Sequence, residues 1–231
     1  SNPLQVGFIG STDTHTGLGG NVEEGQWQGS VFGIGNFQRN MSRLGFNPGG
    51  IVGVWAEQNT RASIFAALKR REVYATSGPR IGLRFHATMA NNGLSCQGPG
   101  GKVERERSTP MGGMLLKGNR APLFRIEANA DRTPIARIEI VKGATRNGKF
   151  EETVETVWSN STGENYACVT WRDKTFESSQ GVYWYPRVIE MPTPRWSSVQ
   201  CRKEGRCADY PDADRTIEER AWGSPIWYAP S

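Results

Sequence analysis

Asp13 and His15 are the residues of this sequence best suited to chemistry. They stand one residue apart, directly after the apolar run Val6–Gly10 and before a glycine-rich stretch. In an extended segment, alternate side chains point to the same side, so a carboxylate and an imidazole would be presented together, which suits a divalent transition metal. A D-x-H pair on its own is more often structural, and a catalytic metal needs three or more protein ligands and one open position. The pair therefore predicts part of a metal site.

Three charged residues are weaker candidates, and none is assigned a catalytic role. Glu23 and Glu24 follow in the loop and could reach a metal or a bound water, although a solvated loop face is the simpler interpretation. Arg80 could meet an anionic group of a substrate, with a surface arginine as the default. His86, the only other histidine, falls in an alternating segment and is expected to be a strand residue, not a ligand.

The elements that would position these residues change character near residue 80. Before it, Val6–Gly10 and Ile51–Trp55 have the pattern of short buried strands. A helix capped by Thr60 or its neighbour Asn59 is expected to run to about Arg71, where basic residues suit the negative pole of the helix dipole. A strand, a loop, a strand and a helix in this order are α/β in character.

After residue 80, apolar and polar residues alternate in short segments. These segments are 81–85, 123–127, 135–141, 154–158, 166–171 and 182–189. Six or more alternating strands without helices between them favour an antiparallel sandwich. We therefore expect an α+β chain that is mainly β, with a first part at 1–79 and a β-sandwich domain at 80–231 that ends in an irregular C-terminal tail.

Composition narrows the class of protein. The net charge of +5 comes from dispersed basic residues, which permits an anionic ligand without indicating nucleic acid. No segment approaches the ~20 apolar residues that would span a bilayer. Cys201 and Cys207 bracket a short polar loop that a disulfide could close, and a pair of free thiols is the other possibility. Among locations, we favour the periplasm or secretion over the cytoplasm.

The eight tryptophans leave a second class of function open. An exposed row of them would indicate a carbohydrate platform, whereas packing in the core is the commoner role. The alternatives to an enzyme are therefore a non-catalytic sandwich that binds sugar or peptide, and a structural domain that packs on the preceding part.

Six blocks of the sequence, spread between residues 7 and 230, carry a resemblance to a known family. They are GFIGSTDTH, NVEEG, GGIVGVWAEQNTRASIFAALKRREVYATSGPRI, RIEIVKG, VIEMPTPRWSS and ERAWGSPIWYAP. The sequence resembles a bacterial family of uncharacterised proteins, catalogued as a domain of unknown function, in the PHP (polymerase and histidinol phosphatase) superfamily of metallohydrolases.

The resemblance implies that residues 1–79 are the remnant of a PHP-type α/β barrel, which keeps its metal ligands at the C-terminal ends of its strands. The last ligand motif of the superfamily, D-x-H, corresponds to Asp13 and His15. The earlier motifs, including an H-x-H, have no match in this sequence and are expected upstream. Two strands and a helix do not close a barrel, so residues 1–79 are expected to dock on the sandwich or to pair with another chain.

The activity that the resemblance implies is hydrolysis, most often of a phosphoester. In the complete protein, two or three divalent ions (Zn, Mn or Fe) would activate a bridging water. The substrate would be a small molecule such as an anionic ester. This chain alone is expected to be inactive or nearly so, and Asp13 and His15 are expected to be able to remain without a bound metal ion in it.

Overall fold

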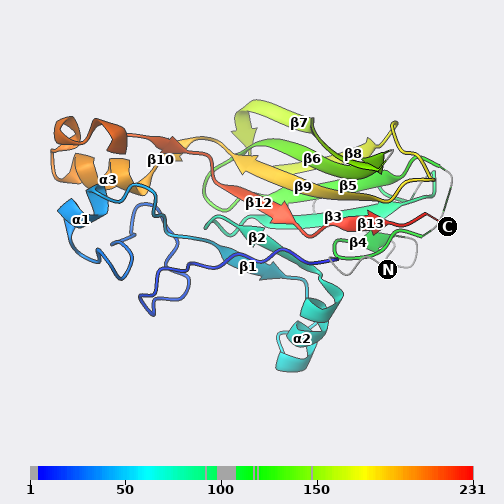
Figure 1. The fold of residues 1–231 in the computed structure, drawn as a ribbon, viewed down its shortest axis with the longest axis horizontal. Coiled ribbons are helices and arrows are strands. Elements are labelled where there is room, and N and C mark those ends of the chain that lie inside the picture. Colours follow the sequence, from blue (N-terminus) through cyan, green and yellow to red (C-terminus); the bar gives the residue numbers. More distant parts are fainter. Residues whose placement is uncertain are drawn as a thin grey trace.

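The computed structural model describes residues 5–91, 93–97, 108–116, 118, 120–146 and 148–230. In these ranges the chain forms two large antiparallel sheets that pack face to face, and a separate two-stranded ribbon (Figure 1). The larger sheet has the order β1 (Ile51–Val54), β2 (Val73–Thr76), β12 (Arg220–Gly223), β9 (Val182–Glu190), β6 (Ile135–Arg146) and β7 (Lys149–Glu164), and β13 (Ile226–Tyr228) also pairs with β9. The smaller sheet has the order β4 (Thr109–Pro110), β3 (Gly82–Thr88), β5 (Leu123–Asn129) and β8 (Tyr166–Arg172). The predicted mainly-β α+β fold is confirmed.

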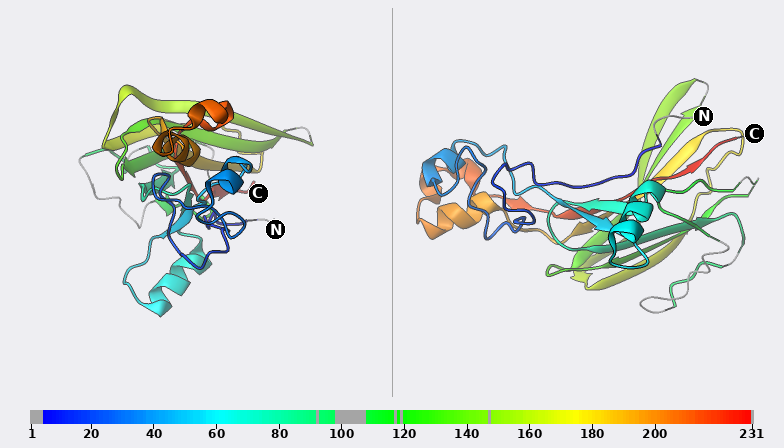
Figure 2. Two further views of the ribbon diagram at one scale, coloured as in Figure 1. Left: turned by 90° about the vertical axis from the view of Figure 1, so that its left-hand side faces the viewer. Right: turned by 90° about the horizontal axis from the view of Figure 1, so that it is seen from below.

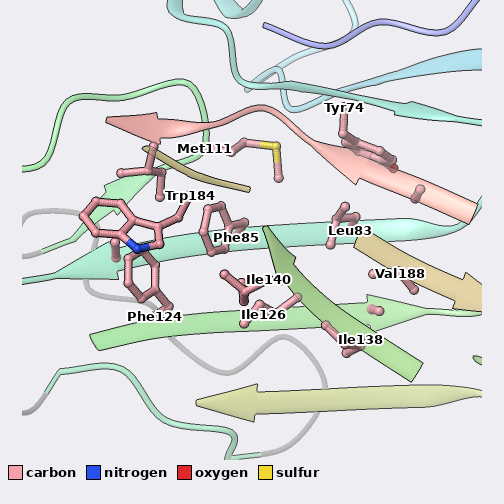
Figure 3. Close-up of a cluster of buried hydrophobic side chains, with 14 of the residues drawn as sticks. Tyr74, Leu83, Phe85, Met111, Phe124, Ile126, Ile138, Ile140, Trp184 and Val188 are labelled. Carbon is pink, nitrogen blue, oxygen red and sulfur yellow. The ribbon is translucent and has the colours of Figure 1, made fainter. Parts of the chain in front are cut away.

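The core lies between the two sheets and follows from the alternation of their strands. Figure 3 shows Phe85, Phe124 and Trp184 meeting in it, and all three side chains are fully buried. Along β9, Val182 and Trp184 face the core, so Tyr183 between them must face outward. The indole nitrogen of Trp184 donates to Asp173 (2.9 Å), which satisfies the one polar group that this side chain buries.

The first part of the chain docks on the sandwich by strand pairing. β2 pairs with β1 on one side and with β12 on the other, antiparallel in both cases. The α/β pattern expected before residue 80 therefore does not produce a parallel unit, and no closed barrel is present among the described residues. Because the larger sheet takes strands from both sides of residue 80, the division of the chain there stays a prediction.

The strand expected at Val6–Gly10 is wrong as a strand, although the segment runs beside β1 (Figure 1). Gly50 N donates to Ser11 O (3.0 Å), but Phe8 N donates to a side chain, Ser224 Oγ (2.9 Å), so no ladder forms. A Cβ on Gly10 would lie 2.5 Å from Ile51 O. Glycine therefore permits this close approach of two backbones.

The helix expected near residue 60 is α2 (Arg61–Arg70), capped by the Thr60 side chain. Arg71 ends it in a left-handed conformation. Two apolar side chains of α2 are uncovered, with Phe65 58% and Leu68 42% exposed, and Figures 1 and 2 show α2 extending away from the sheets. Of the fourteen large hydrophobic side chains exposed in the described ranges, ten belong to residues 6–68. The first part of the chain therefore carries most of the exposed apolar surface.

A small third unit lies at one end of the sandwich (Figure 2). It contains α1 (Phe37–Met41), α3 (Trp196–Lys203), the 3₁₀ turns η2 (Cys207–Asp209) and η3 (Pro211–Ala213), and the two-stranded ribbon of β10 (Thr193–Pro194) and β11 (Thr216–Ile217). Its core brings together segments far apart in the sequence, since the Trp27 and Trp196 rings meet with centroids 4.6 Å apart. The tail expected to be irregular thus forms a helix and contributes β12 and β13 to the larger sheet.

Two disulfides tie the chain. Cys201 and Cys207 are bonded, with Cα atoms 4.8 Å apart, which confirms the first of the two possibilities left open by the sequence. Cys96 and Cys168, 72 residues apart, are also bonded, with Cα atoms 5.6 Å apart. The sequence offers no spacing signal for this second bridge. Among the described residues, no helix has the length and apolar character needed to cross a membrane.

Candidate functional site

Asp13 and His15 lie side by side on the surface. Asp13 Oδ1 is 3.1 Å from His15 Nε2, and the two side chains are 90% and 68% exposed. Both residues have a left-handed backbone, with φ of 50° and 56°. Only a few per cent of non-glycine residues adopt this conformation, with Asp and His among the more tolerant types.

The backbone of this loop, not an extended strand, brings the two side chains together. Thr14 between them is buried, and its carbonyl accepts from Val31 N (2.9 Å). Its hydroxyl lies 3.1 Å from that of Thr16. The expectation of an extended D-x-H is therefore corrected, because two left-handed residues around a buried threonine turn both functional groups to solvent. Left-handed backbone at non-glycine residues costs about 1–3 kcal/mol each, and such strain is concentrated at functional sites.

The pair opens onto a hollow of about 390 Å³ that is lined by residues 11–19. Ser11 at its edge also lines a larger cavity, of about 780 Å³, that continues to Glu24, Ser77, Arg195 and Glu219. Within the described ranges, no group of three or more His, Cys, Asp or Glu side chains could hold a metal ion. Asp13 and His15 therefore offer two donors to a cation.

Another cavity, of about 400 Å³, is lined by the three weaker candidates, Glu23, Glu24 and Arg80. Glu23 accepts two bonds from Arg132 (2.8 and 2.9 Å), so it forms a surface ion pair. The Arg80 backbone N–H donates to Asp131 (2.9 Å). Of the three, Glu24 alone has a side chain that contacts another carboxyl group, that of Glu219.

Glu24, which is half-buried, belongs to a cluster of carboxyl groups that also contains the buried Glu190 and Glu219. The Trp196 backbone N–H donates to Glu24, and the Ser77 hydroxyl donates to Glu219. Burial, and then repulsion by Glu219, raises the pKa of Glu24 to about 7. Burial, then Glu219 and Asp131, raises the pKa of Glu190 to about 8, and burial also raises the pKa of Glu219.

With pKa values of about 7 and about 8, Glu24 and Glu190 can hold and release protons near neutral pH, as general acids and bases must. Glu24 and Glu219 line both the 780 Å³ and the 400 Å³ cavities, so they form the wall between them. Glu190 is only 2% exposed, and its Oε1 has no hydrogen-bond partner. Sequence reasoning missed Glu190 and Glu219 as site residues: both stand in blocks that carry the family resemblance, but neither has a ligand or catalytic spacing that singles it out.

The remaining candidates, His86 and the tryptophans, lie in packed parts of the sandwich and of the third unit. His86 is a buried residue of β3, as expected, with Nδ1 3.4 Å from Ser108 Oγ. All eight tryptophans are within the described ranges, and each is buried or half-buried. They therefore serve packing and do not form an exposed row.

A family model described as “Protein of unknown function (DUF3604)” matches residues 1–162 and 154–230. No match to the chain was found among curated proteins or among solved structures. The two family matches together cover almost all of the sequence. The chain therefore belongs to DUF3604, a family of proteins of unknown function.

Proposed function

We propose that this chain supplies the last metal-ligand pair, Asp13 and His15, of a metal-dependent hydrolase of the PHP superfamily. The observation that carries the proposal is the 3.1 Å separation of Asp13 Oδ1 and His15 Nε2 on an exposed loop. Two ligand atoms that each lie about 2.1 Å from one metal ion are themselves roughly 3 to 3.5 Å apart. The pair thus has the spacing, the donor types and the access that a shared ion requires.

The cost of the loop conformation supports the same function. Two left-handed residues present these side chains to solvent, where neither is needed for packing. Strain of this kind is expected where geometry serves a ligand. When bound, divalent ions would acidify a water and neutralise charge on a phosphoester or related anionic ester.

The chain's own residues define what such a site would need. His15 must be neutral to bind a cation, so its contact with Asp13 would give way to two separate bonds to the ion. The ligands still missing would come from outside this chain. The exposed apolar side chains of residues 6–68 are consistent with a further segment that packs against this part.

Zn²⁺ titration of the intact chain by calorimetry tests the ligand assignment. We expect weak binding of one ion, reduced at least about tenfold by His15→Ala and by Asp13→Asn, because loss of a direct ligand should cost no less than loss of a residue that orients one. Asp212→Asn, which changes an exposed carboxylate elsewhere, should leave the titration unchanged. Equal Zn²⁺ affinity in wild type and His15→Ala would contradict the proposal.

Assays of the chain with generic phosphoesters and Mn²⁺ or Zn²⁺ test whether the active site in this chain is incomplete. We expect no robust turnover, because two ligands do not hold a catalytic ion with an open coordination position. Robust turnover that disappears in His15→Ala would show that the chain has a complete site. The proposal also expects an H-x-H motif in sequence upstream of this chain.

A further inference from the structure

The outer face of the larger sheet carries a row of three aromatic rings. Phe150 on β7 and Tyr183 and Tyr185 on β9 follow one another with centroids 6.3 Å apart at both steps. The planes of neighbouring rings differ by only 21° and 14°. The three rings are therefore nearly parallel and evenly spaced.

Gly143 shows how the row is oriented. It stands on β6 between Glu152 and Tyr183, directly paired with both. A Cβ on Gly143 would lie 2.2 to 2.5 Å from Cζ, Cε1 and the hydroxyl oxygen of Tyr183. The tyrosine ring thus lies flat across the glycine backbone, with one face on the sheet and the other turned outward. Because the neighbouring rings are nearly parallel to it, they share this orientation.

Polar and apolar groups frame the row. The Tyr183 hydroxyl donates to Glu152 (3.0 Å) and fixes the reach of the ring across the sheet. Phe8 packs against Tyr185 with centroids 5.1 Å apart and planes at 82°, and it also lines the groove. These residues line an open groove of about 860 Å³, in which Phe150 is 62% exposed.

We infer that this groove binds a linear β-linked glycan, with successive sugar rings stacked on Phe150, Tyr183 and Tyr185. A pyranose has an apolar face of C–H bonds and a rim of hydroxyls, so it can cover an aromatic ring and still bond to a carboxylate such as Glu152. Equal steps between parallel rings fit a ligand that repeats a ring along a flat ribbon. A step of 6.3 Å is comparable to the length of one sugar residue in such a chain. A single planar ligand would use one ring and leave the others without a role.

The site is independent of Asp13 and His15, so its test is run with a metal chelator present. Cellohexaose and xylohexaose are titrated into the intact chain by calorimetry. We expect binding of at least one of them, weakened roughly two- to tenfold by Phe150→Ala and by Tyr183→Ala, which is the contribution of an aromatic contact of this kind. Phe65→Ala, which removes an equally exposed phenylalanine on α2, should leave the affinity unchanged.

Gly143→Ala provides a second test that removes no aromatic ring. Its methyl group would displace the Tyr183 ring from the sheet, so we expect weaker glycan binding with unchanged thermal stability of the sandwich core. No binding of either hexasaccharide, or binding that Phe150→Ala and Tyr183→Ala leave intact, would overturn the inference. A preference for an α-linked, helical glycan would also overturn it, because a coiled chain does not lie along a flat row.

Discussion

Replacing Cys96 and Cys168 together with serine should lower the free energy of unfolding by about 4 kcal/mol. The bridge closes a loop of 72 residues, and the chain entropy that it removes from the unfolded state grows with loop length. It also ties the segment before β4 to β8 at the edge of the smaller sheet. The measurement is equilibrium unfolding in urea under oxidising conditions, compared with wild type.

The Cys201–Cys207 bridge provides the matched comparison, because it closes a loop with a separation of only 6 residues. The same relation gives it roughly 2 kcal/mol. Each double-serine variant keeps one bridge, and its unfolding is measured with that bridge oxidised and reduced. Reduction breaks the bridge without replacing a side chain, so it separates the entropic effect from a change in packing at the buried Cys201. If loss of the short bridge destabilised the protein more than loss of the long one, loop length would not govern the effect. Both bridges favour an oxidising compartment for this protein.

Glu190→Gln should make the protein more stable than wild type at pH 9, by on the order of 5 kcal/mol. Burial raises the pKa of Glu190 from 4.5 to about 8, so the folded protein binds this proton more tightly than the unfolded chain does. Stability is therefore complete below pH about 4.5 and is lost as the pH rises to about 8, above which the loss is constant. Glutamine keeps the shape of the protonated carboxyl and does not ionise.

Unfolding of wild type and Glu190→Gln at pH 5, 7 and 9 measures this effect. The two proteins should be nearly equal at pH 5 and diverge as the pH rises. Glu204→Gln, on an exposed residue after α3, serves as the control and should follow wild type. A wild-type stability that stays constant from pH 5 to pH 9 would contradict a buried carboxyl cluster. Glu24, with a pKa of about 7, adds to the decline over the lower part of the same range.

The sequence predicts the sandwich well because its evidence is local. Alternation over five or more residues marks β3, β5, β6, β8 and β9, and each has one face in the core. β12 and β13 cannot be recognised from alternation, since they have only four and three residues and are separated by Ser224 and Pro225. The apolar run Val6–Gly10 has the composition of a strand, but a strand also needs a partner edge, and Phe8 bonds to the Ser224 side chain instead.

The sequence likewise predicts some features of the candidate site and not others. The sequence predicts that Asp13 and His15 lie together, but on an extended strand; the left-handed backbone that brings them together has no signal in the residue types alone. Glu24 meets Trp196 across 172 residues of sequence, and this contact exists only after the third unit has folded. Neither charge nor spacing predicts that Glu24, Glu190 and Glu219 will gather in one cluster with two of them buried.

The pairing of β12 also determines the order in which the larger sheet can be completed. β12 lies between β2 and β9, yet the ribosome makes it after both of them. Until residues 220–223 emerge, β1 and β2 have no hydrogen-bonded link to the rest of the sheet, and one edge of β2 is open to other chains. Contacts this distant in sequence slow folding, because the loop-closure entropy is lost before they form. We therefore expect the first eighty residues to depend on chaperones during synthesis more than the strands that follow them.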